Sequence, residues 1–307
     1  MEKKHIGVLM GGKSAERDIS LKSGTAIADS LIRQGWQVTC IDVSPNVGED
    51  LRHNHIDLAF LALHGPGGED GSIQGFLEVI GLPYTGSGIA ASAVGMNKVL
   101  TKSVLKAEGL PTPPSVVLTA NDLSSVMKNK VSLPFSFPAV VKPVSQGSSI
   151  GVSVMHDTGD VQAAYETARE FGHHVLVEQF IAGEEFTVGV IGETALPVLE
   201  ILLEKTLFDF DTKYEVNTTP HAVRATISQA RTHEMQQLAL QVHQSIGCRG
   251  ISRVDIRVDD AANPFVLEIN TIPGMTNESL VPLAARELDI QYDSLVKKVL
   301  SVAMREQ

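Results

Sequence analysis

Strand-like and helix-like segments alternate over the first 90 residues of this chain. Apolar strand-like runs and segments with helical spacing follow one another at 5–10, 19–34, 36–43, 56–63 and 70–80. Strands joined by helices pair in parallel, so the pattern predicts a small parallel sheet covered by helices. Glu16 and His64 each follow the carboxyl end of a predicted strand, where ligands bind in such sheets.

The rest of the 307-residue chain mixes helices and strands without a repeat. Segments with helical spacing lie at 90–108, 161–171, 232–246 and 282–303, and strand-like segments lie at 138–143, 150–155, 175–180 and 184–191. Glycine-containing breaks at 85–88 and 182–183 interrupt this order. We therefore expect an α/β protein with three domains, at residues 1–90, 91–183 and 184–307.

Two stretches near the end of the chain, 253–259 and 265–270, alternate polar and apolar residues. In the first, Val254, Ile256 and Val258 share one face; in the second, Phe265, Leu267 and Ile269 share one face. Side chains of a strand point alternately to its two faces. Each stretch therefore predicts a strand with one buried face and one polar face.

The polar faces of these two strands carry oxygen-bearing side chains. If the strands pair, Asp255, Glu268 and Asn270 converge, with Arg253 beside them. A few hard oxygen ligands suit Mg²⁺, which shares its coordination with water and phosphates. The alternative is a half-buried hairpin with a solvated face, and these two strands alone do not separate the two interpretations.

The composition excludes several classes of protein. The formal net charge is −11, whereas general nucleic-acid and membrane-surface binders are basic. No apolar run is long enough to span a bilayer, and the first residues do not resemble a secretory signal. The chain contains only Cys40 and Cys248, so a disulfide framework is not expected. We expect a cytoplasmic protein that binds neither nucleic acid nor membrane.

Two glycine- and lysine-containing segments could bind phosphate. Residues 7–14 match the P-loop expression and include Lys13, but Val8, Leu9 and Met10 continue a strand where a loop is needed. Lys142 precedes a Gly/Ser turn at 145–149, which can present N–H groups and hydroxyls to phosphates. Lys142 is therefore the stronger prediction, and Lys98 and Lys213 could join it if the fold brings them together.

Many short motifs together resemble the D-alanine–D-alanine ligase family of ATP-grasp enzymes. They occur in order over nearly the whole chain: Ala15-Glu16-Arg17, Leu63-His64-Gly65, Gly68-Glu-Asp-Gly71, Tyr84-Thr-Gly-Ser-Gly88, Val141-Lys142-Pro143, Gly147-Ser-Ser149-Ile-Gly151, Lys213-Tyr214, Arg253-Val-Asp255, Glu268-Ile-Asn270 and Pro273-Gly-Met-Thr276. The resemblance implies a Rossmann-like N-terminal domain followed by two α+β domains that grip ATP. It also implies synthesis of D-alanyl-D-alanine for peptidoglycan through a D-alanyl phosphate.

The resemblance assigns roles around ATP. Lys98 and Lys142 match contacts to the α- and β-phosphates, and Lys213 matches a contact to the γ-phosphate. Glu178 matches the residue that accepts from adenine, and Glu185 matches a ribose contact. By the same resemblance, two Mg²⁺ (or Mn²⁺) ions are bound by three residues: Asp255, Glu268 and Asn270.

The resemblance also assigns residues to the two D-alanine substrates. Glu16 matches the residue that holds the first ammonium, with His64 nearby and Ser148 and Tyr214 as its hydrogen-bond partners. Arg253 and the N–H of Gly274 match an oxyanion site. Ser279 and the N–H of Leu280 match the binding site of the second carboxylate. A lid at about 207–220 and a homodimer are further expectations.

Three departures and three alternatives accompany this interpretation. Gln179 stands where many relatives have Lys, the stretch 215–221 looks short, and Asn277 and Glu278 are unusual. The alternatives are an ATP-grasp ligase for another carboxylate and amine, a nucleotide-binding regulator without chemistry, and a P-loop NTPase that uses Lys13. Tyr214 favours D-alanine over D-lactate as the second substrate.

Overall fold

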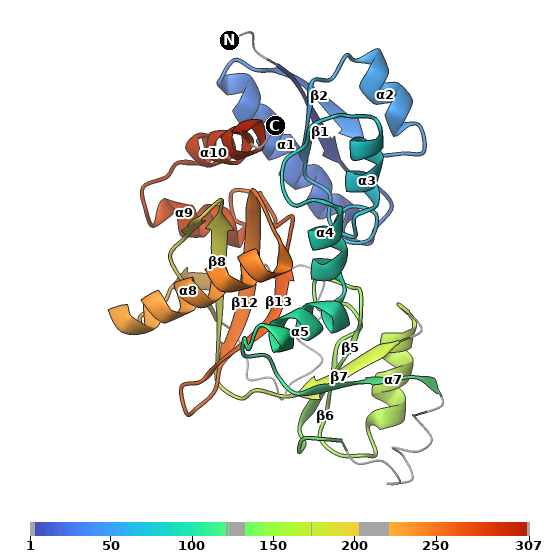
Figure 1. The fold of residues 1–307 in the computed structure, drawn as a ribbon, viewed down its shortest axis with the longest axis vertical. Coiled ribbons are helices and arrows are strands. Elements are labelled where there is room, and N and C mark those ends of the chain that lie inside the picture. The colour runs from blue at the N-terminus through green and yellow to red at the C-terminus, as the bar shows by residue number, and fades with distance from the viewer. Residues whose placement is uncertain (1–3, 121, 123–132, 173, 203–220, 306–307) are drawn as a thin grey trace.

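The computed structural model describes residues 4–120, 122, 133–172, 174–202 and 221–305, which form three sheets with helices around them (Figure 1). The N-terminal sheet lies at the top of the view, the C-terminal sheet in the middle and the central sheet at the bottom. The fold class is therefore the predicted α/β class. Within the described residues, no helix is long and apolar enough to cross a membrane.

The first sheet is parallel, as the alternating pattern predicts. Its strands β1 (His5–Met10), β2 (Gln37–Asp42) and β3 (Leu58–Leu61) pair in the order β2-β1-β3. The helices of this part are α1 (Arg17–Arg33), α2 (Val47–His53) and α3 (Ser72–Val79). The sequence analysis did not predict α2, and α3 begins after Gly71, which has φ 93° and serves as the N-cap. Asp70 accepts from the N–H of Ser72 at 3.0 Å, just outside the helix.

The predicted single helix at 90–108 is wrong, because two helices occupy this segment. They are α4 (Ile89–Met96) and α5 (Lys98–Ala107), and Asn97 between them has extended φ and ψ of −95° and 101°. The Asn97 side chain accepts from the N–H groups of Val99 and Leu100, both at 3.1 Å, and so caps α5. The break places Lys98 in the first turn of a new helix.

The central sheet is antiparallel. It consists of β4 (Ser115–Leu118), β5 (Ala139–Pro143), β6 (Ser153–Met155) and β7 (Val175–Gln179) in the order β4-β7-β5-β6, and α7 (Val161–Arg169) packs against it. Strand β4 was not predicted. The predicted strand at 150–155 is shorter, because Gly151 has φ 72° and the turn continues to that point.

The C-terminal sheet is the largest. It contains β8 (Glu184–Ile191), β9 (Thr194–Ala195), β10 (Leu199–Leu202), β11 (His221–Arg224), β12 (Ile251–Val258) and β13 (Pro264–Asn270), in the order β11-β10-β8-β12-β13 with β9 beside β8. Its helices are α8 (Gln229–Ile246), α9 (Leu280–Arg286) and α10 (Tyr292–Arg305). The apolar face of β12, with Val254, Ile256 and Val258, is buried as predicted, and α8 packs against it.

A β-bulge changes the predicted face of β13. Asp255 pairs with Glu268, but the next residue, Ile256, pairs with Val266, so Leu267 is an extra residue. Val266 and Ile269 are consequently buried and Leu267 is only half-buried. The prediction that Phe265 and Leu267 share the buried face with Ile269 was wrong, because Phe265 lies opposite Arg257 and neither side chain is fully buried, whereas Glu268 lies opposite Asp255 as expected.

The last helix joins the first part of the fold. Helix α10 lies beside α1 (Figure 1), and Arg33 donates to Asp293 at 2.6 and 3.1 Å. One apolar cluster contains Val8 and Leu31 together with Val296 and Leu300. The two ends of the described chain therefore share one core.

Candidate active site

The three predicted metal ligands lie together on β12 and β13. Asp255 and Glu268 are directly paired across the two strands, and Asn270 Nδ2 donates to Asp255 at 3.2 Å. Arg253 makes two hydrogen bonds to Asp255, at 2.9 and 2.7 Å, and the Thr187 hydroxyl also donates to Asp255, at 2.6 Å. Burial disfavours the charge of Arg253, but Asp255 outweighs burial and raises the pKa of the guanidinium. Asp255 is thus a fixed carboxylate.

Glu268 is held by Lys98 from the start of α5. The Lys98 ammonium lies 2.9 Å from Glu268 and donates to the carbonyl of Gln146 at 2.7 Å. Burial alone would raise the pKa of Glu268, but the nearby cations, Lys98 foremost, lower it. Lys98, at the start of the helix after the break, therefore links the metal-ligand candidate Glu268 to the Gly/Ser turn that follows Lys142.

The donor set fits a divalent ion of the Mg²⁺ type. Within the described residues, no three His, Cys, Asp or Glu side chains gather in a group that could hold a metal alone. The group here is two carboxylates and one amide, which leaves coordination positions for water and phosphate oxygens, as Mg²⁺ prefers. The lysines around it would meet the phosphates.

A buried ion-pair group lies in the central part. Glu178 on β7 contacts both Lys142 on the neighbouring strand β5 and Lys102 on α5, the latter at 2.8 Å. The side chains are almost fully buried, with 3% of Glu178, 3% of Lys102 and 8% of Lys142 exposed. Burial alone would raise the pKa of Glu178, but the two ammonium groups lower it. Glu178 is therefore an ionised, buried acceptor.

Glu16 and Ser148 connect the N-terminal and central parts. The Ser148 hydroxyl donates to Glu16, and Ser148 has φ 51°, a left-handed conformation that costs a residue other than glycine roughly 1–2 kcal/mol. The second oxygen of Glu16 is buried and has no hydrogen-bond partner within the described residues. A methyl group on Gly65 would lie 2.8 Å from that oxygen, and one on Gly147 would lie 3.2 Å from it. Glycines thus leave space beside a free acceptor.

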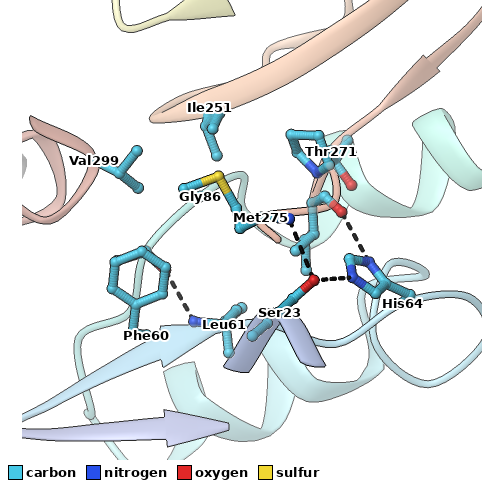
Figure 2. A pocket seen from close by; sticks show the side chains of 13 residues that line it. Ser23, Phe60, Leu61, His64, Gly86, Ile251, Thr271, Met275 and Val299 are labelled. Atoms are coloured by element: carbon cyan, nitrogen blue, oxygen red, sulfur yellow. Dashed lines mark hydrogen bonds between the residues drawn. The ribbon is translucent and has the colours of Figure 1, made fainter. Parts of the chain in front are cut away.

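His64 supports the loop that follows β13 (Figure 2). Its Nδ1 lies 3.1 Å from the carbonyl of Ile272, and its Nε2 lies 3.3 Å from the hydroxyl of Ser23. Because a carbonyl can only accept, Nδ1 donates to it, and Nε2 accepts from Ser23. Ser23 in turn accepts from the N–H of Met275 at 3.2 Å. Burial lowers the pKa of His64 to about 4, so the ring is neutral.

The loop carrying Gly274 lies against the start of α9. Ser279 Oγ accepts from the N–H of Thr276 at 3.0 Å, and Leu280 is the first residue of α9. A methyl group on Gly274 would lie 2.9 Å from Ser279 Oγ. The structure therefore brings Gly274, Ser279 and Leu280 together, and a side chain at 274 would displace the Ser279 hydroxyl.

The remaining predicted residues have mixed outcomes. Glu185 on β8 lies 3.9 Å from Arg257, which stacks over Phe180. Lys213 and Tyr214 lie outside the described residues, as does the whole of the predicted lid at 207–220. A hollow beside the metal-ligand candidates is lined by Glu69, Lys98, Gln146, Gly147, Glu268 and Asn270, among others.

The P-loop alternative has no support from the backbone. Residues 7–10 belong to β1, as the apolar pattern predicts. The N–H of Gly11 donates to Ser20 Oγ at 2.8 Å, and that of Gly12 donates to Asp42 at 3.3 Å. These N–H groups are engaged within the protein and form no phosphate cradle.

Comparison with known proteins decides the family. The family model described as the D-ala D-ala ligase C-terminus matches residues 104–301, and the one for the D-ala D-ala ligase N-terminus matches residues 45–87. The chain belongs to the D-alanine–D-alanine ligase family. A D-alanine–D-alanine ligase of Pelotomaculum thermopropionicum is 42% identical over 97% of this chain and 96% of that protein. That of Trichlorobacter lovleyi is 42% identical over 97% and 95%.

Solved structures of the ligase family agree with the fold. The D-alanine–D-alanine ligase of Bacillus anthracis, complexed with ATP, has a TM-score of 0.83 and 30% identity and covers 98% of each chain. The VanG D-Ala:D-Ser ligase of Enterococcus faecalis has a TM-score of 0.84 and 26% identity, over 98% of this chain and 100% of that one. The ATP-grasp fold expected from the motifs is confirmed.

Sequence reasoning missed two buried residues of this ligase site. Lys102 lies four residues after Lys98, on the same face of α5 as the buried Leu105, and a lysine on an apolar face was the available signal. Glu69 accepts from the N–H groups of Gly65 and Ile272, at 2.8 and 3.2 Å, and burial raises its pKa to about 7. Nothing in the spacing around Glu69 indicates that its partner is 203 residues away.

Proposed function

We propose that this chain joins two D-alanines, with ATP as the source of energy and ADP and phosphate as the other products. The observation that carries the proposal is the free, buried oxygen of Glu16 beside Ser148. A buried acceptor without a partner is costly unless a ligand supplies a donor, and an amino-acid ammonium supplies three N–H groups. Family membership supports D-alanine as that amino acid.

ATP would lie between the central and C-terminal sheets. Lys98 and Lys142 are the proposed contacts of the α- and β-phosphates, and Lys213 would reach the γ-phosphate. Glu178 would accept from the 6-amino group of adenine, since each carboxylate oxygen has two lone pairs and the lysines leave some of them free. Glu185 would contact the ribose. ATP in the Bacillus anthracis relative supports the nucleotide.

Two Mg²⁺ (or Mn²⁺) ions are proposed to be held by Asp255, Glu268 and Asn270. When bound, such ions neutralise phosphate charge in the transition state. The chain itself contributes fixed ligands, because Arg253 and Thr187 hold Asp255 and Lys98 holds Glu268.

The first D-alanine carboxylate would attack the γ-phosphorus and form an acyl phosphate while the bond to ADP breaks. The amine of the second D-alanine would then attack the acyl carbon, lose a proton and expel phosphate. Arg253 and the N–H of Gly274 would stabilise the oxyanion, and one such donor is typically worth roughly 3 kcal/mol. Glu16, Ser148 and Tyr214 would orient the first substrate, with His64 supporting the Gly274 loop.

The second substrate would place its carboxylate on Ser279 and the N–H of Leu280, at the start of α9. The alternative is a ligase for another amine, and the VanG D-Ala:D-Ser relative makes D-serine the specific competitor. Tyr214 favours D-alanine over D-lactate. We further propose three domains, at 1–90, 91–183 and 184–307, a homodimer and a role in peptidoglycan precursor synthesis.

Phosphate release measured across D- and L-amino acids tests the function. We expect D-alanine to give turnover far above D-serine, D-lactate with D-alanine, and all L-amino acids, and mass spectrometry to detect D-alanyl-D-alanine. Lys142→Ala should abolish turnover, while the matched variant Lys13→Ala should retain it. Equal rates with unrelated amino acids, or loss of turnover only in Lys13→Ala, would contradict the proposal.

A further inference from the structure

Lys102 is a buried cation held by one ion pair and two hydrogen bonds. Its ammonium lies 2.8 Å from Glu178 Oε2, 2.8 Å from the Thr112 hydroxyl and 3.1 Å from the carbonyl of Pro113. Thr112 in turn donates to the carbonyl of Val266 at 2.9 Å, which fixes the acceptor itself. These three groups hold Lys102 within the protein, so its role is assigned to Glu178 and not to the nucleotide.

Lys142 differs from Lys102 in what holds it. Within the described residues, Glu178 is the partner that the structure gives to the Lys142 ammonium. The proposed function moves Lys142 onto a phosphate of ATP. Glu178, which is 2% exposed, would then lose one of its two cations while it remains buried.

We propose that Lys102 is a positioning residue that keeps Glu178 ionised when Lys142 turns to the phosphates, and so sets the preference of the site for adenine. The inference rests on the proposed use of Glu178 as the adenine acceptor. An ionised carboxylate can only accept, which matches the 6-amino group of adenine and opposes the 6-oxo group of hypoxanthine. A protonated carboxyl could donate to that 6-oxo group and would lose the distinction.

The charges around Glu178 support this role. Among the described residues, the charged groups that contact Glu178 are Lys102 from α5 and Lys142 from β5, and its partner on β4 is the uncharged Ser115. Burial would raise the pKa of Glu178, and these two cations oppose that rise. Burial, together with repulsion from Lys142, lowers the pKa of Lys102 to about 8, so Lys102 is charged at neutral pH and its charge is less opposed once Lys142 leaves.

The test compares the affinities of ADP and inosine diphosphate, which differ at position 6 of the base. The native protein should prefer ADP. At pH 6.5, Lys102→Met should reduce the preference for ADP about ten-fold, the factor that corresponds to one lost hydrogen bond to a charged group. At pH 8.5 Glu178 should ionise in this variant, and the preference should return. Lys102→Arg should restore the preference, and Lys106→Met, an exposed lysine on the same helix, should leave it unchanged.

The outcomes separate this inference from the proposed function. A native protein that binds neither diphosphate contradicts the function itself. A native preference that Lys102→Met leaves intact, or an equal loss of both affinities without pH dependence, overturns the inference alone. If Lys102→Met does not fold, the native protein decides: a constant preference between pH 6 and 7.5 supports an ionised Glu178, and a titration within that range overturns it.

Discussion

At the scale of single residues, three carboxylates of the site each lie beside one or two cations. Asp255 has Arg253, Glu268 has Lys98 and Glu178 has Lys102 and Lys142. The desolvation of buried charges is costly, and paired cations offset it. The residue types were readable from the sequence, whereas the pairs between α5, β5 and β7 depend on the fold.

Glu268→Gln should reduce ligation at least roughly 100-fold, because a bound metal contributes several kcal/mol to stabilising the transition state. The matched control is Glu234→Gln on α8, where an exposed carboxylate contacts Arg231. Phosphate release and Mg²⁺ titration would measure the effect. Native-like turnover of Glu268→Gln would show that Glu268 is not a metal ligand in the reaction.

At the scale of elements, the break between α4 and α5 determines where Lys98 lies. In a helix continuous with α4, the helical period would set the direction of the Lys98 side chain. The Asn97 cap instead starts a new helix, α5, at Lys98. The Asn97 side chain therefore determines where Lys98, a proposed phosphate contact, lies.

Asn97→Ala should lower the free energy of unfolding by about 1 kcal/mol, the usual value of a lost N-cap. It should also raise KM for ATP, because the start of α5, and with it the position of Lys98, is no longer fixed. Asn97→Asp keeps an acceptor oxygen and is the control. Urea unfolding and initial rates would measure both effects, and an Asn97→Ala protein that matches the native one in both would show that the cap is dispensable.

Periodicity predicted the strands and the helices better than it predicted their irregularities. The parallel first sheet and the polar face of β12 followed from alternation alone. The extra residue Leu267 did not, because a bulge is decided by the partner strand rather than by the pattern of its own residues. Lys102 and Glu69 were missed for the same reason, since their partners lie on other elements.

At the scale of the whole molecule, two buried histidines make stability depend on pH. Burial lowers the pKa of both His64 and His243 to about 4, from an ordinary 6.5. Between pH 4 and 6.5 the unfolded chain therefore binds more protons than the folded one. Each such histidine lowers stability by about 1.4 kcal/mol per pH unit as pH falls through this range, while Glu69, whose pKa burial raises to about 7, acts in the opposite direction and offsets part of this fall.

His243→Gln should remove the contribution of one histidine from the slope of unfolding free energy against pH. His243 lies 2.6 Å from the hydroxyl of Ser252, and glutamine can keep a hydrogen bond there while it cannot titrate. His233→Gln, at an exposed position of the same helix, should retain the native slope. Unfolding free energies from pH 4.5 to 7 would measure the slopes, and an unchanged slope in His243→Gln would refute the argument.

The shared core of α1 and α10 has a consequence for synthesis on the ribosome. Arg33 and Asp293, which pair across these helices, are 260 residues apart in the chain. A nascent polypeptide therefore exposes part of the apolar surface around Val8 and Leu31 until its distant cover has been translated. Such exposure invites aggregation and chaperone binding, so the core beside the first sheet is closed late although the sheet itself emerges early.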